Sequence, residues 1–295
     1  MKNLLLRVAA TSILLAPAVP AQISTPFTVD PRSYSALQWR NLGPFRAGRT
    51  SAVSGVIGQP GVFYMGLPAA GVWKTTSAGA TWFPVMDGVR EVSSIGAVEV
   101  APSNGNVIYA GTGDIITGGS INEGNGVYKS MDAGRSWTHV GLDATKQIPS
   151  MQIDPRDPNI VLVAGQGDVH KKSHDRGVFR TIDGGATWTQ TLFVDDSTGI
   201  VRLARAFDAP QVIFAASVAH YAAPPTPPTS TASPAGGVRP PPPTGPTSTK
   251  LFKSTDGGVT WMEITGGGLP ARLTGKMGVA VAMKTNAQRV FVIGD

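Results

Sequence analysis

A twelve-residue segment occurs four times in this chain with unchanged internal spacing, and it constrains the fold more than any other feature. Each copy runs from an aromatic residue through a basic and a hydroxyl-bearing residue to a glycine, and ends in Thr-Trp or Ser-Trp. Such self-similarity indicates a repeat architecture in which each copy belongs to one supersecondary unit. The copies are GVWKTTSAGATW (71–82), GVYKSMDAGRSW (126–137), GVFRTIDGGATW (177–188) and KLFKSTDGGVTW (250–261).

Apolar segments between the copies supply further strands. Each copy follows a run of β-branched and aromatic residues such as VIYAG (107–111), and an earlier apolar run such as SMQIDPRDPN (150–159) ends in a Pro or Asn turn. Alternation continues after each Trp, so each unit is expected to hold four short strands. Units of about 50 residues with four antiparallel strands and no helical period predict an all-β fold, the β-propeller, in which neighbouring blades supply each other's core. A β-sandwich, the alternative, does not explain one identical turn per four strands.

The spacing predicts about four and a half blades. The limits of the blades are 49–87, 92–143, 147–194, 198–265 and a fifth that starts at 276 and stops on its second strand. An unclosed ring leaves an open sheet edge, which closed folds avoid. We therefore expect the chain to be the N-terminal fragment of a longer protein.

The repeated turn fits the Asp-box pattern, [ST]-x-D-x-G-x-[ST]-W, also called the BNR repeat. A carboxylate in this turn can accept backbone N–H groups, the glycine can take positive φ, and the Trp can anchor the hairpin between blades. Because the same aspartate recurs in several blades, we interpret it as structural rather than catalytic. The residues concerned are Asp132, Gly134, Trp137, Asp183, Gly185, Trp188, Asp256, Gly258 and Trp261, and Ser77 replaces the aspartate in the first copy.

Composition excludes several classes of function. The chain has 295 residues and no cysteine, which rules out disulfides, thiolate metal sites and cysteine nucleophiles. Its formal net charge of +6 is scattered, without the basic clusters of a nucleic-acid footprint. With 41% hydrophobic residues it can bury a core, whereas 36 Gly and 24 Pro indicate a turn-rich fold.

Two segments stand outside the repeats. Residues 1–21 have a basic start, an apolar stretch too short to span a bilayer and a small-residue cleavage site near Ala21, which predicts a signal peptide rather than a membrane anchor. We expect an exported protein without a membrane span in the mature chain, with a lead-in at 22–48 whose segment 37–42 could close the ring, and a partial propeller at 49–295. The proline-rich stretch 221–249 predicts an exposed insertion between two strands of the fourth blade.

Antiparallel alternation places candidate site residues on one face. The Asp-box turns share a face with the turns from first to second strands, so variable loops gather on the opposite face, where ligands are expected. Paired carboxylates there would suit glycoside hydrolysis, but we favour the interpretation that they are solvated loop charges. The two histidines lie in a loop with lysines between them, which argues against a metal site, and no cofactor is indicated. The weak catalytic candidates are Asp114, Glu123, Asp168 and Asp175, and the ligand-binding candidates are Arg46, Arg49, His170 and His174.

The chain resembles exported bacterial Asp-box propeller proteins of the sortilin-like and BNR-repeat glycosyl hydrolase group. The resemblance rests on WRNLGPFRAGR (39–49), the four turns, and YAGTGD (109–114), and it covers nearly all of the mature chain. Two enzyme groups share the Asp-box. Xyloglucan-degrading propellers place a catalytic Asp where this chain has Leu67-Pro68-Ala69-Ala70, and sialidases carry an RIP-like motif that PFRAGR (44–49) matches loosely.

We expect a propeller that binds an extracellular glycan or protein ligand. The alternative is a glycoside hydrolase whose active site is completed by residues beyond Asp295. A third class, a sorting receptor like sortilin, would bind a peptide inside the channel. No nucleic-acid partner is expected.

Overall fold

The structure is a computed structural model that describes residues 30, 49–92, 94–115, 122–219, 249–270, 273 and 275–294. Residues 47–295 form one compact unit, which is the part described below. The predicted signal peptide (1–21), Arg46 and the segment 37–42 lie outside the described residues, as does the insertion at 221–249 except for Thr249.

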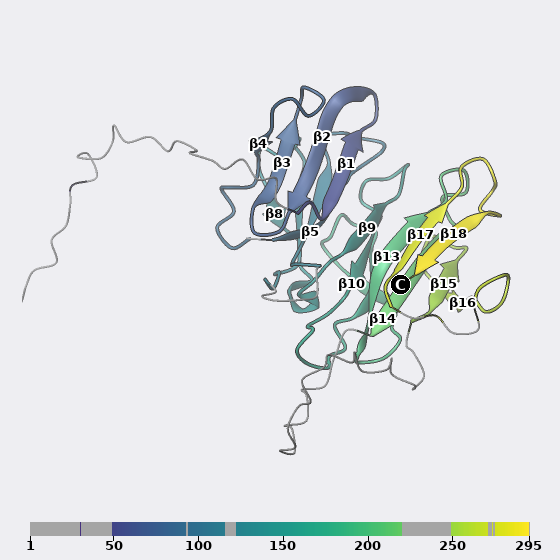
Figure 1. Cartoon of the computed structure of the whole chain (residues 1–295). Coiled ribbons are helices and arrows are strands. Elements are labelled where there is room, and N and C mark those ends of the chain that lie inside the picture. The colour runs from purple at the N-terminus through teal and green to yellow at the C-terminus, as the bar shows by residue number, and fades with distance from the viewer. Residues whose placement is uncertain are drawn as a thin grey trace, which may run out of the picture. The chain divides into compact units, whose positions relative to one another are not determined.

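The described chain is built from antiparallel sheets that follow one another in sequence (Figure 1). In each four-stranded sheet the spatial order of the strands is their order in the chain, and the last two strands form a pair. The prediction of four blades and half of a fifth is confirmed. The first two blades comprise β1 (Ala52–Val56), β2 (Gln59–Leu67), β3 (Gly71–Thr75) and β4 (Phe83–Pro84), then β5 (Ile95–Val100), β6 (Ile108–Thr112), β7 (Val127–Ser130) and β8 (Thr138–His139). The next two comprise β9 (Ser150–Ile153), β10 (Val161–Gly165), β11 (Gly177–Thr181) and β12 (Thr189–Leu192), then β13 (Thr198–Arg205), β14 (Ile213–Ala219), β15 (Leu251–Ser254) and β16 (Met262–Glu263). The last pair is β17 (Met277–Val281) and β18 (Val290–Gly294).

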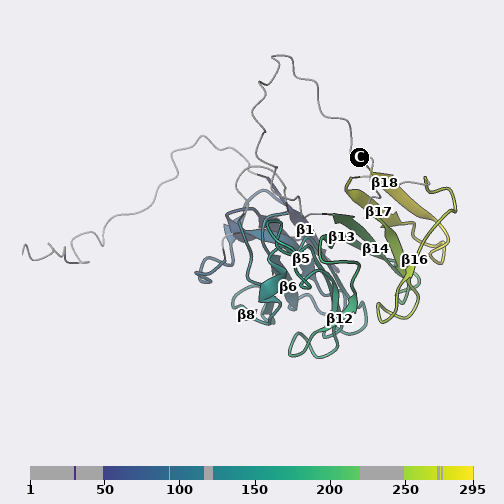
Figure 2. The same cartoon turned by 90° about the horizontal axis from the view of Figure 1, so that it is seen from below.

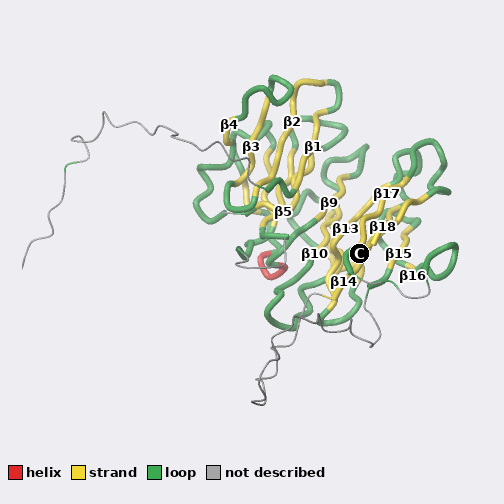
Figure 3. Tube along the Cα trace, in the orientation of Figure 1, coloured by secondary structure: helices red, strands yellow, loops and turns green. Residues whose placement is uncertain are grey.

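The first strands of consecutive blades contact one another, β1 with β5, β5 with β9, β9 with β13 and β13 with β17. In Figure 2, β1 and β5 lie side by side, with β8 and β12 farther out. Loops and turns join the strands, and the 3-10 helix η2 (Asp143–Thr145) lies between the second and third blades (Figure 3). No helix in the described ranges is long and apolar enough to cross a membrane.

The core lies between blades and not within them. Each of four apolar clusters draws its residues from two consecutive blades. On β10, Val161 and Val163 belong to the cluster shared with the second blade, whereas Leu162 and Ala164 belong to the cluster shared with the fourth. Side chains of a strand alternate between its two faces, so a blade covered on both sides needs an unbroken apolar run. This is why the segment 160–165 is uniformly apolar.

Three of the four repeated tryptophans join their own blade to the preceding one. Trp137 Nε1 donates to Val85 O at 2.8 Å and Trp188 Nε1 donates to Val140 O at 2.7 Å. Trp261 Nε1 donates to Thr191 Oγ1 at 3.2 Å. All three rings are half-buried and pack on the cluster between blades. Trp82 belongs to none of the described clusters, because no described blade precedes the first.

We call the segments 75–82, 130–137, 181–188 and 254–261 the tryptophan turns. In the second of them, Asp132 Oδ1 accepts hydrogen bonds from Ser136 N at 2.9 Å and from Ser130 Oγ at 2.8 Å, and Oδ2 accepts one from Ser136 Oγ at 2.6 Å. Asp183 and Asp256 make the same contacts in their own turns.

Hydrogen bonds within the turn set the acidity of these aspartates. Those from Ser136 lower the pKa of Asp132 to about 2. The equivalent bonds from Thr187 hold the pKa of Asp183 well below its usual range. For Asp256, burial acts to raise the pKa, but bonds from Thr260 and Ser254 outweigh it. Each carboxylate is therefore ionised at neutral pH and engaged inside its own hairpin, an arrangement unlike that of a general acid.

The basic residue of the repeat points toward the following blade. Lys74 Nζ donates to Ala133 O at 3.2 Å, and Arg180 Nε donates to Gly257 O at 3.3 Å, so each reaches a carbonyl of the next tryptophan turn. Lys74 also lies 5.1 Å from the ring centre of Tyr64, its cross-strand partner. Lys129 and Lys253 lie over Tyr109 and Phe214 in the same way, at 5.4 and 5.8 Å. Cation–π pairs thus recur in three of the four complete blades.

Candidate functional site

Antiparallel pairing divides the loops between two faces. The tryptophan turns and the turns from first to second strands lie on one face, and the remaining connections lie on the other. On that other face, Gln166 N donates to Gln147 O at 2.9 Å and Ser173 N donates to Asp196 O at 3.0 Å, so loops of the third blade contact the flanking connections. We call the described parts of 113–126, 140–149, 166–176 and 193–197 the loop face.

Two predicted carboxylates occupy equivalent places in neighbouring blades. Asp114 and Asp168 each follow a second strand and a glycine of positive φ, +99° at Gly113 and +77° at Gly167. Each is 7% exposed. The expectation that the loop carboxylates are solvated is therefore wrong for these two, because the connections between blades cover the strand ends. Asp168 Oδ1 accepts a hydrogen bond from His170 N at 2.8 Å.

The other candidates on this face are more exposed. Glu123 pairs with Lys146 at 3.2 Å, which ties the loop of the second blade to the connection behind it. His170 is exposed, and His174 lies against Phe193 with 5.0 Å between ring centres. Asp175 is half-buried, and its N–H donates to Ser173 Oγ at 3.3 Å. Of the two candidate arginines, Arg49 is exposed just before β1, and Arg46 is not described.

A buried arginine organises the loop of the third blade. Arg176 is 0% exposed, and its Nη1 donates to Gln166 O at 2.7 Å. Its Nη2 donates to Lys171 O at 2.7 Å and also to Asp168 O. Burial lowers the pKa of Arg176, and the nearby carboxylates of Asp168, Asp195 and Asp196 counteract that shift. Three main-chain carbonyls spread over this loop thus converge on one guanidinium.

Sequence reasoning did not single out Arg176. The only local signal is its place at the very start of a third strand, in RGVFR (176–180), where other copies of the repeat have Ala70, Asn125 and Thr249.

A second polar region lies between the first strands of four blades. A cavity of about 260 Å³ is lined by residues of β1, β5, β9 and β13, among them Glu99, Gln152 and Arg202. We call this cavity among the first strands the channel. Glu99 is half-buried, and it forms no ion pair with any described residue. A carboxyl of β5 and a guanidinium of β13 therefore line one small cavity.

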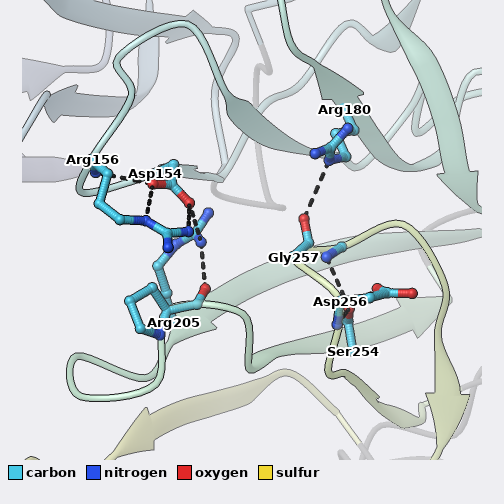
Figure 4. A network of polar contacts seen from close by, with 9 residues as sticks. Asp154, Arg156, Arg180, Arg205, Ser254, Asp256 and Gly257 are labelled. Carbon is cyan, nitrogen blue, oxygen red and sulfur yellow. Dashed lines mark hydrogen bonds and ion pairs between the residues drawn. The ribbon is translucent and has the colours of Figure 1, made fainter.

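A network of charged groups bridges the third and fourth blades (Figure 4). Asp154 Oδ2 lies 3.4 Å from Arg205 Nη1, and both side chains are 7% exposed. Arg205 Nη1 also donates to Pro210 O at 2.6 Å, and Arg156 Nε lies 3.3 Å from Asp154 Oδ1. Burial lowers the pKa of Arg205 to about 10, and Asp154 opposes the shift. The network joins the end of β9 to the end of β13.

Burial raises the pKa of Glu99 to about 7, although the positive charges of Arg202 and Arg205 act to lower it. Between the ordinary pKa and the raised one, the folded state binds more protons than the unfolded state. Stability contributed by the neutral carboxyl is therefore complete below the ordinary pKa and is lost as pH rises through the raised one. The protonation of Glu99 therefore changes near neutral pH.

The variant Glu99→Gln is expected to be more stable than the parent above about pH 8 by about 1–3 kcal/mol, and to match it near about pH 4. Solvent screens part of the interaction, because the group is half-buried. Urea unfolding across this pH range measures the difference. Glu263→Gln, which alters an exposed ion pair with Lys250, is the control and should show no such pH-dependent gain. A constant difference between parent and Glu99→Gln at all pH values would contradict the assignment.

Comparisons with solved structures identify the fold of the chain. No family model and no curated protein matches the sequence. The solved structure of an ancestral GH74 enzyme is 20% identical with a TM-score of 0.57, and the match covers 83% of this chain and 29% of that one. The GH74 xyloglucanase from Xanthomonas campestris is 18% identical with a TM-score of 0.55, covering 79% and 32%. YCF48 from Cyanidioschyzon merolae is 16% identical with a TM-score of 0.46, covering 85% and 68%. The fold is a partial β-propeller. The chain spans about a third of the length of the two GH74 structures.

Proposed function

We propose that this chain belongs to an exported Asp-box propeller that binds an extracellular glycan or protein ligand through its loop face. The observation that carries the proposal is the contrast between the two faces. On the tryptophan-turn face each aspartate is engaged within its own hairpin, in nearly the same way from blade to blade. On the loop face, connections of unlike length present charged groups on a loop that the buried Arg176 holds in place. Fixed, blade-specific polar loops on a rigid scaffold are typical of binding sites.

The likeness to a GH74 xyloglucanase supports a glycan as the ligand, because that protein acts on one and shares the fold. The export signal expected at 1–21 supports an extracellular setting. A glycan also suits a face that combines carboxylates and lysines with exposed imidazoles, since sugar hydroxyls both donate and accept hydrogen bonds.

Glycan-array and pull-down screens of the purified protein test the proposal. We expect a ligand whose affinity falls at least about fivefold in Lys171→Ala and in His170→Ala, two exposed positions on the loop face. Lys284→Ala, an exposed change in the fifth blade, should bind as the parent does. Failure of both screens, or equal binding by all three variants, would contradict the proposal.

A glycoside hydrolase is the second candidate function, and the two buried aspartates favour it. Asp114 and Asp168 hold equivalent places in adjacent blades, and each lies buried on the loop face, where paired carboxylates would suit glycoside hydrolysis. Under this hypothesis, residues beyond Asp295 complete the active site. If the protein releases reducing sugar, and Asp114→Ala or Asp168→Ala abolishes that release, the hydrolase hypothesis is favoured over a binding function without catalysis.

A further inference from the structure

A groove between the first two blades combines two cationic side chains with an exposed aromatic ring. It measures about 450 Å³ and lies between the outer strand β4 and the tryptophan turn 130–137. We call it the rim groove. It shares no residue with the loop face, and its side chains include Lys74, Phe83, Asp87 and Arg135.

The cations of the rim groove outnumber its carboxylates. Lys74 and Arg135 face a single acidic lining residue, Asp87. Lys74 is held in place, since its Nζ donates to Ala133 O at 3.2 Å and lies over the ring of Tyr64. Burial lowers the pKa of Lys74, and the positive charge of Arg135 lowers it further. Two like charges thus lie close enough to repel each other, and an anion between them would relieve that repulsion.

Arg135 makes no ion pair or side-chain hydrogen bond with any residue in the part of the chain that the structure describes, and it is exposed. Phe83 is 42% exposed beside it. Guanidinium groups match carboxylates in a planar, two-bonded geometry. An aromatic ring next to such a cation offers a flat apolar surface to the same ligand.

The repeat shows that this combination is particular to one interface. At the place of Arg135 the other turns have Ala80, Ala186 and Val259. At the place of Phe83 the other blades have Thr138, Thr189 and Met262. Neither residue is therefore needed to build a tryptophan turn or an outer strand.

We propose that the rim groove binds an acidic saccharide. A sugar carboxylate lies between Arg135 and Lys74, and the apolar face of the same sugar ring packs on Phe83. The choice of a saccharide over another anion rests on the glycan ligand proposed above. The contacts that form the rim groove do not depend on that proposal. The groove gives a charged polysaccharide a second binding site, in addition to the loop face.

Calorimetric titration of the purified protein with a galacturonate oligomer tests the rim groove, with the methyl-esterified oligomer as a matched ligand that lacks the charge. We expect binding of the acid form, with affinity reduced about tenfold in Arg135→Ala and in Lys74→Met, and about threefold or more in Phe83→Thr. These replacements, except methionine, are residues that the same position holds in other blades. Lys129→Met, the equivalent change in the second blade, is the control and should bind as the parent does.

Two outcomes would overturn the inference: equal affinity for the acid and the ester, or unchanged affinity in Arg135→Ala. Its failure is separable from failure of the proposed function. Loss of galacturonate binding in Lys171→Ala but not in Arg135→Ala would place the ligand on the loop face and reject the rim groove alone. Binding at the rim groove with no ligand on the loop face would reject the proposed loop-face function and keep the rim groove.

Discussion

Replacing Gly185 by alanine is expected to lower the free energy of unfolding by about 3–5 kcal/mol. Two costs combine at this position. Its φ of +97° is a conformation that residues with a Cβ rarely adopt, and an added Cβ would lie 2.8 Å from Val140 Cβ of the preceding blade. The surrounding interface is part of the apolar core between the second and third blades, so neither side can give way cheaply.

Gly79→Ala separates these two costs. Gly79 holds the same place in the first tryptophan turn with a φ of +92°, but the nearest atom to its added Cβ is 3.8 Å away. This variant should lose only the conformational part, about 1–2 kcal/mol. Urea unfolding of both proteins measures the difference. Equal losses would show that contact between blades contributes nothing at this glycine.

Replacing Arg176 by methionine is the second large effect, and it should cost about 3–5 kcal/mol. Methionine fills part of the volume but leaves the carbonyls of Gln166, Asp168 and Lys171 without their shared donor. Amide hydrogen exchange of residues 168–174 should rise together with the loss of stability, because the loop loses the group that gathers it.

Lys172→Met is the matched control in the same loop. The Lys172 side chain is 57% exposed and pairs with Asp196 at 3.6 Å. Surface ion pairs contribute little, so this change should alter stability by at most about 0.5 kcal/mol and leave exchange in the loop unchanged. If Arg176→Met also leaves both quantities unchanged, the loop is held by something other than the guanidinium.

Local repetition explains why the blades could be predicted. The same spacing from hydroxyl to aspartate to tryptophan recurs, and each contact of Asp183, for example, lies within four residues along the chain. The apolar runs that form the second strands follow from burial on both faces, which is again a property of a short segment. These patterns can be recognised within a short stretch of sequence, without information on residues far away in the chain.

The polar groups in the interior could not be predicted in the same way. Glu99 is half-buried because inner strands of neighbouring blades surround it, and Arg205 meets Asp154 from 51 residues away. Nothing in the spacing around IGAVEV (95–100) indicates that its glutamate faces the channel. The rim groove likewise needs Phe83 and Arg135 from different blades. The topology predicts on which face loop carboxylates such as Asp168 lie, but it does not predict whether their side chains are buried or exposed.

The contacts of the tryptophan turns have a direction. In the second, third and fourth turns the indole reaches back to the preceding blade, whereas Lys74 and Arg180 reach forward to the next turn. Coupling of this kind is confined to nearest neighbours, as in a one-dimensional chain of units. If a whole blade were inserted, each indole could still donate to the preceding blade and each basic side chain to the next turn. A partial blade would leave one donor and one acceptor without a partner. Blade number in such a protein can therefore change over evolution only in whole steps.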